Sequence, residues 1–315
     1  MNFEPDDDQR AFLDAVEKLA AGHAATPAIA ERLQTSDALE NDLAQSGFFE
    51  AMQIDELGPV AATAMVVALA RMPLCTELVA SALIAPWLCP GRPRPFAVLW
   101  EHDDAPTRFL PVARTLIRVR AAQVDVACID AGDVTPVESL FAYPMGVLKQ
   151  PSAIGWERLP DADAARVRDG WRVGLAAEAA GCLGAALDAV LAHVKERRQF
   201  GRPLGAFQAV QHRLAECAAL VAGVKWLALH AAGSASPLDA ALAAGQAQEI
   251  ARKVAYDLHQ FMGAMGLTLE HPLHRWTYRT KLLASDLGGA ARQFTAAAQA
   301  AWPAAASTAP EGTTQ

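Results

Sequence analysis

The chain has 315 residues, of which 52% are hydrophobic, and a formal net charge of −8 at pH 7. A chain of this length can bury a large core and is expected to form more than one domain. The basic residues are dispersed through an acidic chain, which argues against nucleic acid as a partner.

The start is polar and acidic, unlike a secretory signal. The longest uncharged apolar runs, residues 57–70 and 78–91, are too short to cross a bilayer. The five cysteines show no metal-ligand spacing and suit a reducing compartment. These features predict a cytoplasmic protein with no membrane span.

The N-terminal part, residues 6–90, is predicted to be helical. Apolar residues recur at helical spacing near its start, at Phe12, Leu13, Val16 and Leu19. Residues 61–71 are apolar almost all round, which is typical of a buried helix. A break rich in proline and glycine at residues 90–95 ends this part. We therefore place an N-terminal helical domain at residues 1–92.

Short runs rich in β-branched or aromatic residues follow, separated by Asp, Gly and Pro. These runs are residues 96–100, 109–112, 116–119, 124–129 and 134–140. They predict a small antiparallel β domain over residues 93–157.

Four long amphipathic helices are predicted beyond it and would form a four-helix bundle over residues 158–302. The first, residues 163–195, carries Gly174, Gly181 and Gly184, which would let neighbouring helices approach closely. The second covers about residues 207–232, and the fourth about residues 273–301. The third begins with Ser236 as its cap and Pro237 at its first position. The Ala/Ser/Thr/Pro-rich tail, residues 303–315, is predicted to be disordered.

A basic corner at residues 196–208 joins the first two of these helices. Gly201 is expected to take the left-handed conformation that closes a helix, and Pro203 to prevent its continuation. Guanidinium groups bind phosphate oxygens in bidentate fashion, so Arg197 and Arg198 suit a phosphate-bearing ligand. On physical grounds alone, a solvated basic turn between two helices is the alternative.

The corner carries the pattern R-x-Q-F-G-x-P-x-x-x-F-Q, and a second, glycine-rich motif begins at Gln260, with Glu270, Pro272 and Arg279 behind it. In this order and at this distance, the two motifs resemble those of the acyl-CoA dehydrogenase family. The resemblance covers residues 163–302 well, the first 90 residues loosely and the middle poorly. It implies a mainly α fold with a small β domain, in which an N-terminal helical domain, a reduced middle β-barrel and a C-terminal four-helix bundle follow one another.

Members of that family use flavin adenine dinucleotide (FAD), which takes a hydride from the β carbon of an acyl-CoA while a glutamate removes an α proton. The resemblance therefore implies FAD as cofactor and acyl-CoA as substrate. The residues that match the family's contacts to the pyrophosphate and adenosine of a neighbouring chain's flavin are Arg197, Gln199, Phe200, Gln208, Gln260 and Gly266. Asp169 and Arg172 match contacts beside the thioester and its pantetheine. The alternative to a cofactor role for the first set is that these residues only maintain inherited bundle packing. The alternative to a substrate role for Asp169 and Arg172 is that they are two exposed charges.

Two parts of the family's machinery are missing. Nothing between Pro93 and Leu159 matches the run that contacts the flavin ring in the family. One family position for the catalytic base holds Gly288 here, and the other holds Trp171. Glu178 lies two helical turns from Trp171, and Asp286 lies two residues from Gly288. Both stay open as weak candidates for the base, although each is expected to be a solvated or bundle-facing carboxylate.

Our leading hypothesis is a subunit resembling the short subunits of heteromeric (α2β2) acyl-CoA dehydrogenases. It would complete the FAD site of a homologous catalytic partner and carry no base of its own. Similar paired enzymes handle bulky acyl-CoAs such as steroid side chains, and electron-transfer flavoprotein or another acceptor would take the electrons. One alternative is a self-sufficient homo-oligomer that uses Glu178 or Asp286, and the other is a scaffold that binds no flavin. No metal site is predicted, because His271 and His274 have no third ligand in view.

Overall fold

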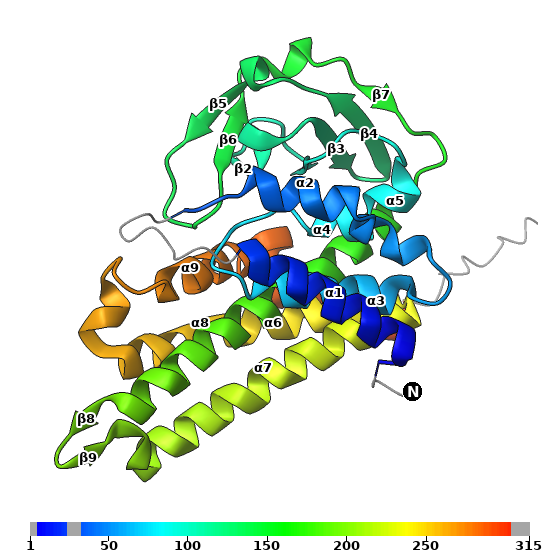
Figure 1. Ribbon diagram of the computed structural model, residues 1–315. Helices are drawn as coiled ribbons and strands as arrows, with labels where there is room; N and C mark the ends of the chain where they lie inside the picture. Colours follow the sequence, from blue (N-terminus) through cyan, green and yellow to red (C-terminus); the bar gives the residue numbers. More distant parts are fainter. Residues whose placement is uncertain (1–4, 24–32, 304–315) are drawn as a thin grey trace, which may run out of the picture.

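The computed structural model describes residues 5–23 and 33–303. Figure 1 shows the β domain on one side of the N-terminal helices and the long C-terminal helices on the other. The tail predicted at residues 303–315 lies outside the described residues, except for its first residue, Pro303. The prediction of a mainly α fold with a small β domain is confirmed.

The N-terminal helices form the middle layer. They are α1 (Asp7–His23), α2 (Asp37–Gln45), the 3₁₀ helix η1 (Phe48–Gln53), α3 (Gly58–Ala70), α4 (Val79–Leu83) and α5 (Ala85–Leu88). The hydroxyl of Ser36 caps α2 by accepting a hydrogen bond from the backbone N–H of Leu39. As its composition predicts, α3 is buried on nearly all sides between the other N-terminal helices and the bundle.

The β domain holds two small sheets. Strands β1 (Phe96–Trp100), β3 (Thr115–Arg120), β4 (Gln123–Cys128) and β7 (Glu157–Arg158) form one, in the order β1-β3-β4-β7. Strands β2 (Thr107–Arg108), β6 (Met145–Leu148) and β5 (Val134–Val137) form the other, in the order β2-β6-β5. The 3₁₀ turns η2 (Leu110–Val112), η3 (Ala131–Asp133) and η4 (Pro151–Ala153) connect them.

Two expectations for this domain are wrong. The sheet is not purely antiparallel, because β1 pairs with β3 in parallel, with Phe96 opposite Thr115. Residues 109–112 are not a strand but mainly the 3₁₀ turn η2, which Phe109 enters in a left-handed conformation. Side-chain composition alone does not distinguish a buried apolar turn from a short strand.

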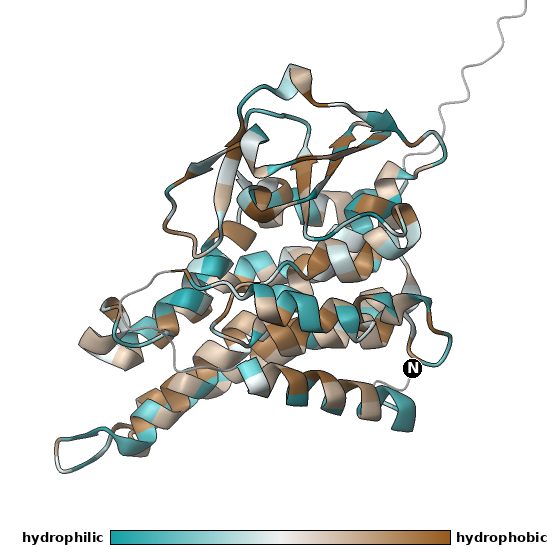
Figure 2. Ribbon diagram, turned by 45° about the horizontal axis from the view of Figure 1, so that its top comes forward, coloured by the Kyte–Doolittle hydropathy of each residue, from teal (hydrophilic) through white to brown (hydrophobic). Residues whose placement is uncertain are grey.

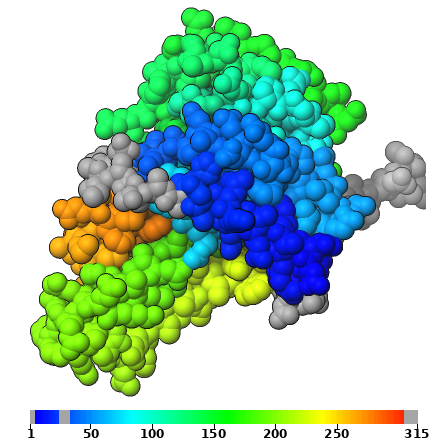
Figure 3. All heavy atoms as spheres, viewed as in Figure 1, coloured from blue at the N-terminus to red at the C-terminus, as the bar shows by residue number. Residues whose placement is uncertain are grey.

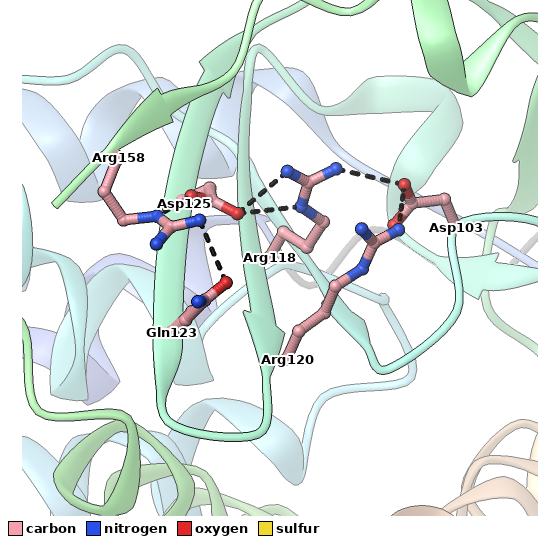
Figure 4. Close-up of polar contacts among 6 residues, drawn as sticks. All are labelled: Asp103, Arg118, Arg120, Gln123, Asp125 and Arg158. Atoms are coloured by element: carbon pink, nitrogen blue, oxygen red, sulfur yellow. Dashed lines mark hydrogen bonds and ion pairs between the residues drawn. The ribbon is translucent and has the colours of Figure 1, made fainter.

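An alternating ladder of charges crosses the first sheet (Figure 4). Arg118 contacts Asp125 at 2.8 Å on one side and Asp103 at 3.1 Å on the other. Arg158 and Arg120 extend the ladder at its two ends, and the guanidinium of Arg118 also lies over the ring of Trp156 at 3.8 Å. These ion pairs link β3, β4 and β7 to the loop that carries Asp103, and they add to the apolar core of this domain.

The C-terminal helices form the bundle. They are α6 (Ala164–Glu196), α7 (Gln208–Ser234), α8 (Pro237–Met262), α9 (Leu273–Leu283) and α10 (Gly289–Ala301), with the 3₁₀ turns η5 (Leu204–Ala206), η6 (Gly263–Leu267) and η7 (Asp286–Gly288) between them. Ser236 caps α8 as predicted. The expected single helix over residues 273–301 is wrong, because it breaks at η7, where Leu287, Gly288 and Gly289 all have positive φ.

Close helix packing depends on two glycines of α6. A Cβ at Gly174 would lie 2.2 Å from a methyl group of Val79 in α4. A Cβ at Gly181 would lie 2.4 Å from the carbonyl oxygen of Val67 in α3. The expectation that small residues let neighbouring helices approach is therefore confirmed at both positions.

By length and composition, α6 and α7 could each cross a membrane. In this structure they pack into the bundle, and 72% of the apolar window of α6 is buried against other helices. A buried core helix passes the same compositional test, so these two helices are weak evidence for a span. Figure 2 shows hydrophobic residues concentrated where the helices pack on one another.

Candidate functional site

The basic corner lies at the far end of the bundle, where α6 ends and α7 begins. Residues Arg198–Gln199 (β8) and Arg202–Pro203 (β9) pair as a two-stranded hairpin. Its loop residues, Phe200 and Gly201, both have positive φ, the geometry of the favoured type I′ turn. The expectation that Gly201 closes the helix is therefore wrong. Instead, α6 ends at Glu196 and Gly201 turns the hairpin.

The corner projects away from the N-terminal layer (Figure 3). Phe200 at its tip is 88% exposed, and its ring meets that of Phe207 edge to face, with the centroids 6.2 Å apart. The cofactor-binding candidates Arg197, Gln199 and Gln208 are also exposed. A bulky aromatic ring and three long polar side chains held out in solvent fit a surface that contacts another molecule.

The glycine-rich motif lies at the same end of the bundle (Figure 1). Gln260 is exposed in the last turn of α8, and Gly266 is buried in η6, where a Cβ would lie 3.0 Å from Met262. Burial and the nearby His193 of α6 lower the pKa of His271, which follows this motif. The two motifs of the sequence thus share one end of the fold, while the roles proposed for these residues stay predictions.

A second constellation lies under the β domain, around Glu178 of α6. The Glu178 carboxylate is 3% exposed and lies 2.6 Å from Nη1 of Arg108 in β2. Its other oxygen accepts a hydrogen bond of 2.7 Å from the hydroxyl of Tyr143. Glu178 was expected to face solvent or the bundle, and that expectation is wrong. A buried ion pair and a phenol hold it against the β domain.

The Arg108 guanidinium also packs on aromatic rings. It lies 4.6 Å from the ring centroid of Trp171 and 5.1 Å from that of Tyr143. Arg108 is 6% exposed, and its Nε and Nη2 atoms have no hydrogen-bond partner among the described residues. Because a cation on an aromatic face is attracted to the ring, this packing partly compensates for lost hydration.

Trp171 and Asp286, which are far apart in the sequence, contact each other beside the Arg108–Glu178 pair. The indole Nε1–H of Trp171 donates a hydrogen bond of 2.9 Å to Oδ2 of Asp286. Two buried amides hold the turn that carries Asp286. Gln248 donates to the carbonyl oxygens of Leu283 and Asp286, and Gln293 donates to that of Leu287.

A small cavity of about 240 Å³ remains between these groups and the β domain. Its walls include Trp100, His102, Arg108, Trp171 and Asp286. The rings of Trp100 and Trp171 meet edge to face at 5.7 Å. The aromatic and guanidinium side chains therefore occupy much of the space between α6 and the β domain.

Burial shapes the titration of this cluster. Burial raises the pKa of Asp286, although nearby Arg108 and the bond from Trp171 oppose the shift. Burial and the neighbouring Glu178 carboxylate hold the pKa of Tyr143 well above its ordinary value. Burial alone would lower the pKa of Arg108, but Glu178, Tyr143 and Asp286 together outweigh it, so the pKa of this guanidinium is raised. The Arg108–Glu178 contact is therefore an internal ion pair.

Asp169 and Arg172 form an ion pair of their own, 2.7 Å apart, at the start of α6. Arg172 Nε also donates to Oε1 of Gln293 in α10. The alternative of two freely exposed charges is thus wrong, since both side chains are at least half-buried. Burial raises the pKa of Asp169, against the opposing effect of Arg172.

Sequence reasoning did not find Arg108, Tyr143, Gln248 or Gln293. The local sequence offers no clear signal, because Gln248 stands beside Glu249, Gln293 beside Arg292 and Arg108 beside Thr107. Arg279, in contrast, was noted in the second motif. It proves to be structural, because its buried guanidinium donates to the carbonyl oxygens of Met72, Leu74 and Arg275.

Residues 169–304 match the family model described as acyl-CoA dehydrogenase, C-terminal domain. The chain is 35% identical over 177 residues to the acyl-CoA dehydrogenase FadE34 of Mycobacterium tuberculosis, which is 54% of this chain and 24% of that protein. It is also 35% identical over 114 residues to the acyl-CoA dehydrogenase IpdE2 of Mycolicibacterium smegmatis, or 36% of this chain and 37% of that protein. The matches therefore span well under two thirds of these relatives' own lengths.

Solved structures match over nearly the whole chain. The ChsE4-ChsE5 complex from Mycobacterium tuberculosis contains a chain with a TM-score of 0.79 at 21% identity, over 97% of this chain and 100% of that one. Butyryl-CoA dehydrogenase from Megasphaera elsdenii matches with a TM-score of 0.74 at 19% identity, over 96% of this chain and 100% of that one. At these identities the likeness concerns the fold, and it confirms the predicted three-part architecture.

Proposed function

The chain belongs to the acyl-CoA dehydrogenase family, and from this premise we propose that it is the non-catalytic subunit of a heteromeric, FAD-dependent acyl-CoA dehydrogenase. The complex would introduce a double bond between the α and β carbons of an acyl-CoA in the cytoplasm. This chain would complete the cofactor site of a homologous catalytic partner. The acyl group would be bulky, as in fatty acid or steroid side-chain degradation.

One observation carries the proposal: this chain's own side chains fill the space beside its base positions. Trp171 occupies one position, and its indole has a donor but no basic site. Gly288 occupies the other and has no side chain. Arg108 stacks on Trp171 and pairs with Glu178, while Asp286 accepts the indole N–H. The cavity of about 240 Å³ that is left lies below the usual size of a small-molecule site, roughly 300–1,000 Å³.

The corner, in contrast, fits a bound dinucleotide. When bound, FAD would accept the hydride from the β carbon of the substrate. Arg197 would hold the pyrophosphate of a partner's FAD, with the amides of Gln199, Gln208 and Gln260 and the ring of Phe200 around it. Among the described residues no side-chain hydrogen bond or ion pair engages Arg197, so its guanidinium is free to bind phosphate oxygens.

The colour of the purified protein tests this proposal. We expect the chain alone to be colourless and its complex with the partner, a homologous chain encoded nearby, to be yellow and to sediment as a heteromer. A chain that is yellow by itself would favour a homo-oligomer that uses Glu178 or Asp286. A complex that is colourless even with added FAD would favour the flavin-free scaffold and contradict the proposal.

The homo-oligomer stays the second candidate because Asp286 lines the cavity and Glu178 is buried next to it, paired with the cavity residue Arg108. A base must reach the α proton of the substrate directly or through one water. With Glu178 already bonded to Arg108 and Tyr143, both of its oxygens are engaged. We therefore favour the heteromer.

A further inference from the structure

A second cavity, of about 460 Å³, lies on the other side of α6 from Trp171. At about 100° per residue, Val173 on its wall points about 200° away from Trp171. It is bounded by η1, α3, α4, α5, α6 and the turn between α7 and α8, and its inner wall includes the small residues Gly170, Ala231, Ala232 and Ala240. The cavity therefore exists because small side chains stand where these elements meet.

Direct contact between α4 and α6 closes off the space between the two cavities. Val79 packs so tightly on Gly174 that no Cβ would fit between them. The cavity is thus separate from the cluster around Arg108 and has to be explained on its own. Its volume falls within the range of small-molecule sites, roughly 300–1,000 Å³.

Three charged residues line the rim, and the two carboxylates among them are already engaged. Asp163 caps α6 by accepting from the backbone N–H groups of Ala165 and Arg166. Asp169 is paired with Arg172 at 2.7 Å. The Arg166 guanidinium lies 4.0 Å from the ring centroid of Trp87, whose indole N–H donates to the carbonyl oxygen of Leu83. Arg166 has no carboxylate partner among the described residues, and it lies on the exposed side of the rim.

From this wall and rim, we propose that the cavity is a binding site for an uncharged apolar small molecule of hydrocarbon character. The small residues supply the volume, and Trp87 and Val173 supply apolar contact. A charged ligand inside the cavity would lose its hydration without a buried counter-charge beside it, which is costly. This proposal goes beyond the subunit role and involves neither flavin nor partner. The ligand site and the subunit role can therefore each fail without affecting the other.

The test is calorimetric titration of the full chain, alone and in its complex, with the probe series 1-hexanol, 1-octanol and 1-decanol. Burial of a methylene contributes about 0.8 kcal/mol, so affinity should rise about fourfold per added CH₂ until the cavity is full. Decanoate should bind more weakly than 1-decanol, because the apolar interior of the cavity offers its carboxylate no buried cation.

A matched pair of variants locates the site. Ala165 is exposed at the mouth of the cavity, and Ala192 is exposed further along the same helix, away from it. Ala165→Trp should abolish binding of the alcohols, whereas Ala192→Trp should bind as wild type does. Both positions are exposed, so both variants should fold.

The proposal is overturned if wild type shows no saturable binding, if affinity does not grow with chain length, or if Ala165→Trp still binds 1-decanol. Tighter binding of decanoate than of 1-decanol would overturn the choice of an uncharged ligand. If the alcohols do not bind and Ala165→Trp instead prevents assembly with the partner, the cavity is a protein interface, and the proposal fails.

Discussion

Trp171 and Asp286 are 115 residues apart in the chain, yet the indole N–H of one donates to the carboxylate of the other at 2.9 Å. This bond joins the first turns of α6 to the break between α9 and α10. The sequence resemblance predicts that Trp171 stands at one base position of the family and that Asp286 stands two residues from the other. On that prediction, the bond occupies space that a reacting substrate would need.

The first prediction is that neither carboxylate of the cluster is the catalytic base. In the complex with the partner, Glu178→Gln and Asp286→Asn should each leave turnover per folded enzyme within a few-fold of wild type. A positioned base typically contributes about 10²–10⁴ in rate. A hundredfold fall in either variant, with flavin still bound, would make this chain catalytic.

The second prediction concerns the stability that the same Glu178 provides. Removing one partner of a buried ion pair leaves the other charge uncompensated, so Glu178→Gln should lower the free energy of unfolding by up to about 3–5 kcal/mol. Asp188→Asn is the matched control, since it breaks a surface pair with Arg71 and should cost at most about 1 kcal/mol. Equal effects in urea denaturation would argue against the buried pair.

The third prediction assigns the cofactor contact of the corner. A hydrogen bond to a charged group contributes about 1.5–3 kcal/mol, so Arg197→Ala should weaken FAD binding by the complex about 10- to 150-fold. Arg198→Ala should do less, because Arg198 lies within the hairpin and its guanidinium approaches the carbonyl oxygen of Gly201. Fluorescence titration of FAD measures both, and unchanged affinity in Arg197→Ala would refute the assignment.

The fourth prediction is a loss of stability as the pH rises. Burial, together with nearby Glu77, raises the pKa of Glu40 from 4.5 to about 8, although Arg94 opposes the shift. Between these two values the folded chain keeps a proton that the unfolded chain has released, so stability should fall as the pH rises from 4.5 to about 8. Glu40→Gln should flatten this slope in denaturation measured at pH 5 and pH 8. Glu56→Gln, at an exposed site, controls for the chemical change. A slope that is identical in wild type and Glu40→Gln would count against the assignment.

The fifth prediction tests helix packing with two glycines. A Cβ at Gly181 would meet the main chain of α3, so Gly181→Ala should destabilise the protein by about 1–3 kcal/mol. Gly223 in α7 has nothing within 4 Å of such a Cβ, so Gly223→Ala should stabilise it by about 0.5–1 kcal/mol. Thermal unfolding of both variants should show shifts of opposite sign; a loss of stability in both would contradict this packing.

The sequence by itself determined the features that depend on neighbours along the chain. Ser236 and Pro237 start α8 as predicted because capping acts within one turn of helix. The apolar surface of α3 and the small residues of α6 predicted their burial and close packing, since periodicity and side-chain size are local properties. The order and spacing of the two motifs sufficed to predict the resemblance to the acyl-CoA dehydrogenase family. The domain boundaries and the roles of the site residues stay predictions.

Only the tertiary structure decided what surrounds Glu178. Its partners, Arg108 and Tyr143, lie 70 and 35 residues away, so no local signal links them. The parallel pairing of β1 with β3 and the break at η7 likewise depend on which segments meet, because backbone groups there are satisfied by distant partners. From sequence alone, an acidic residue on an apolar helix is expected to face solvent, because the arginine that neutralises it cannot be identified. In this protein that arginine comes from the β domain, where sequence resemblance is poorest.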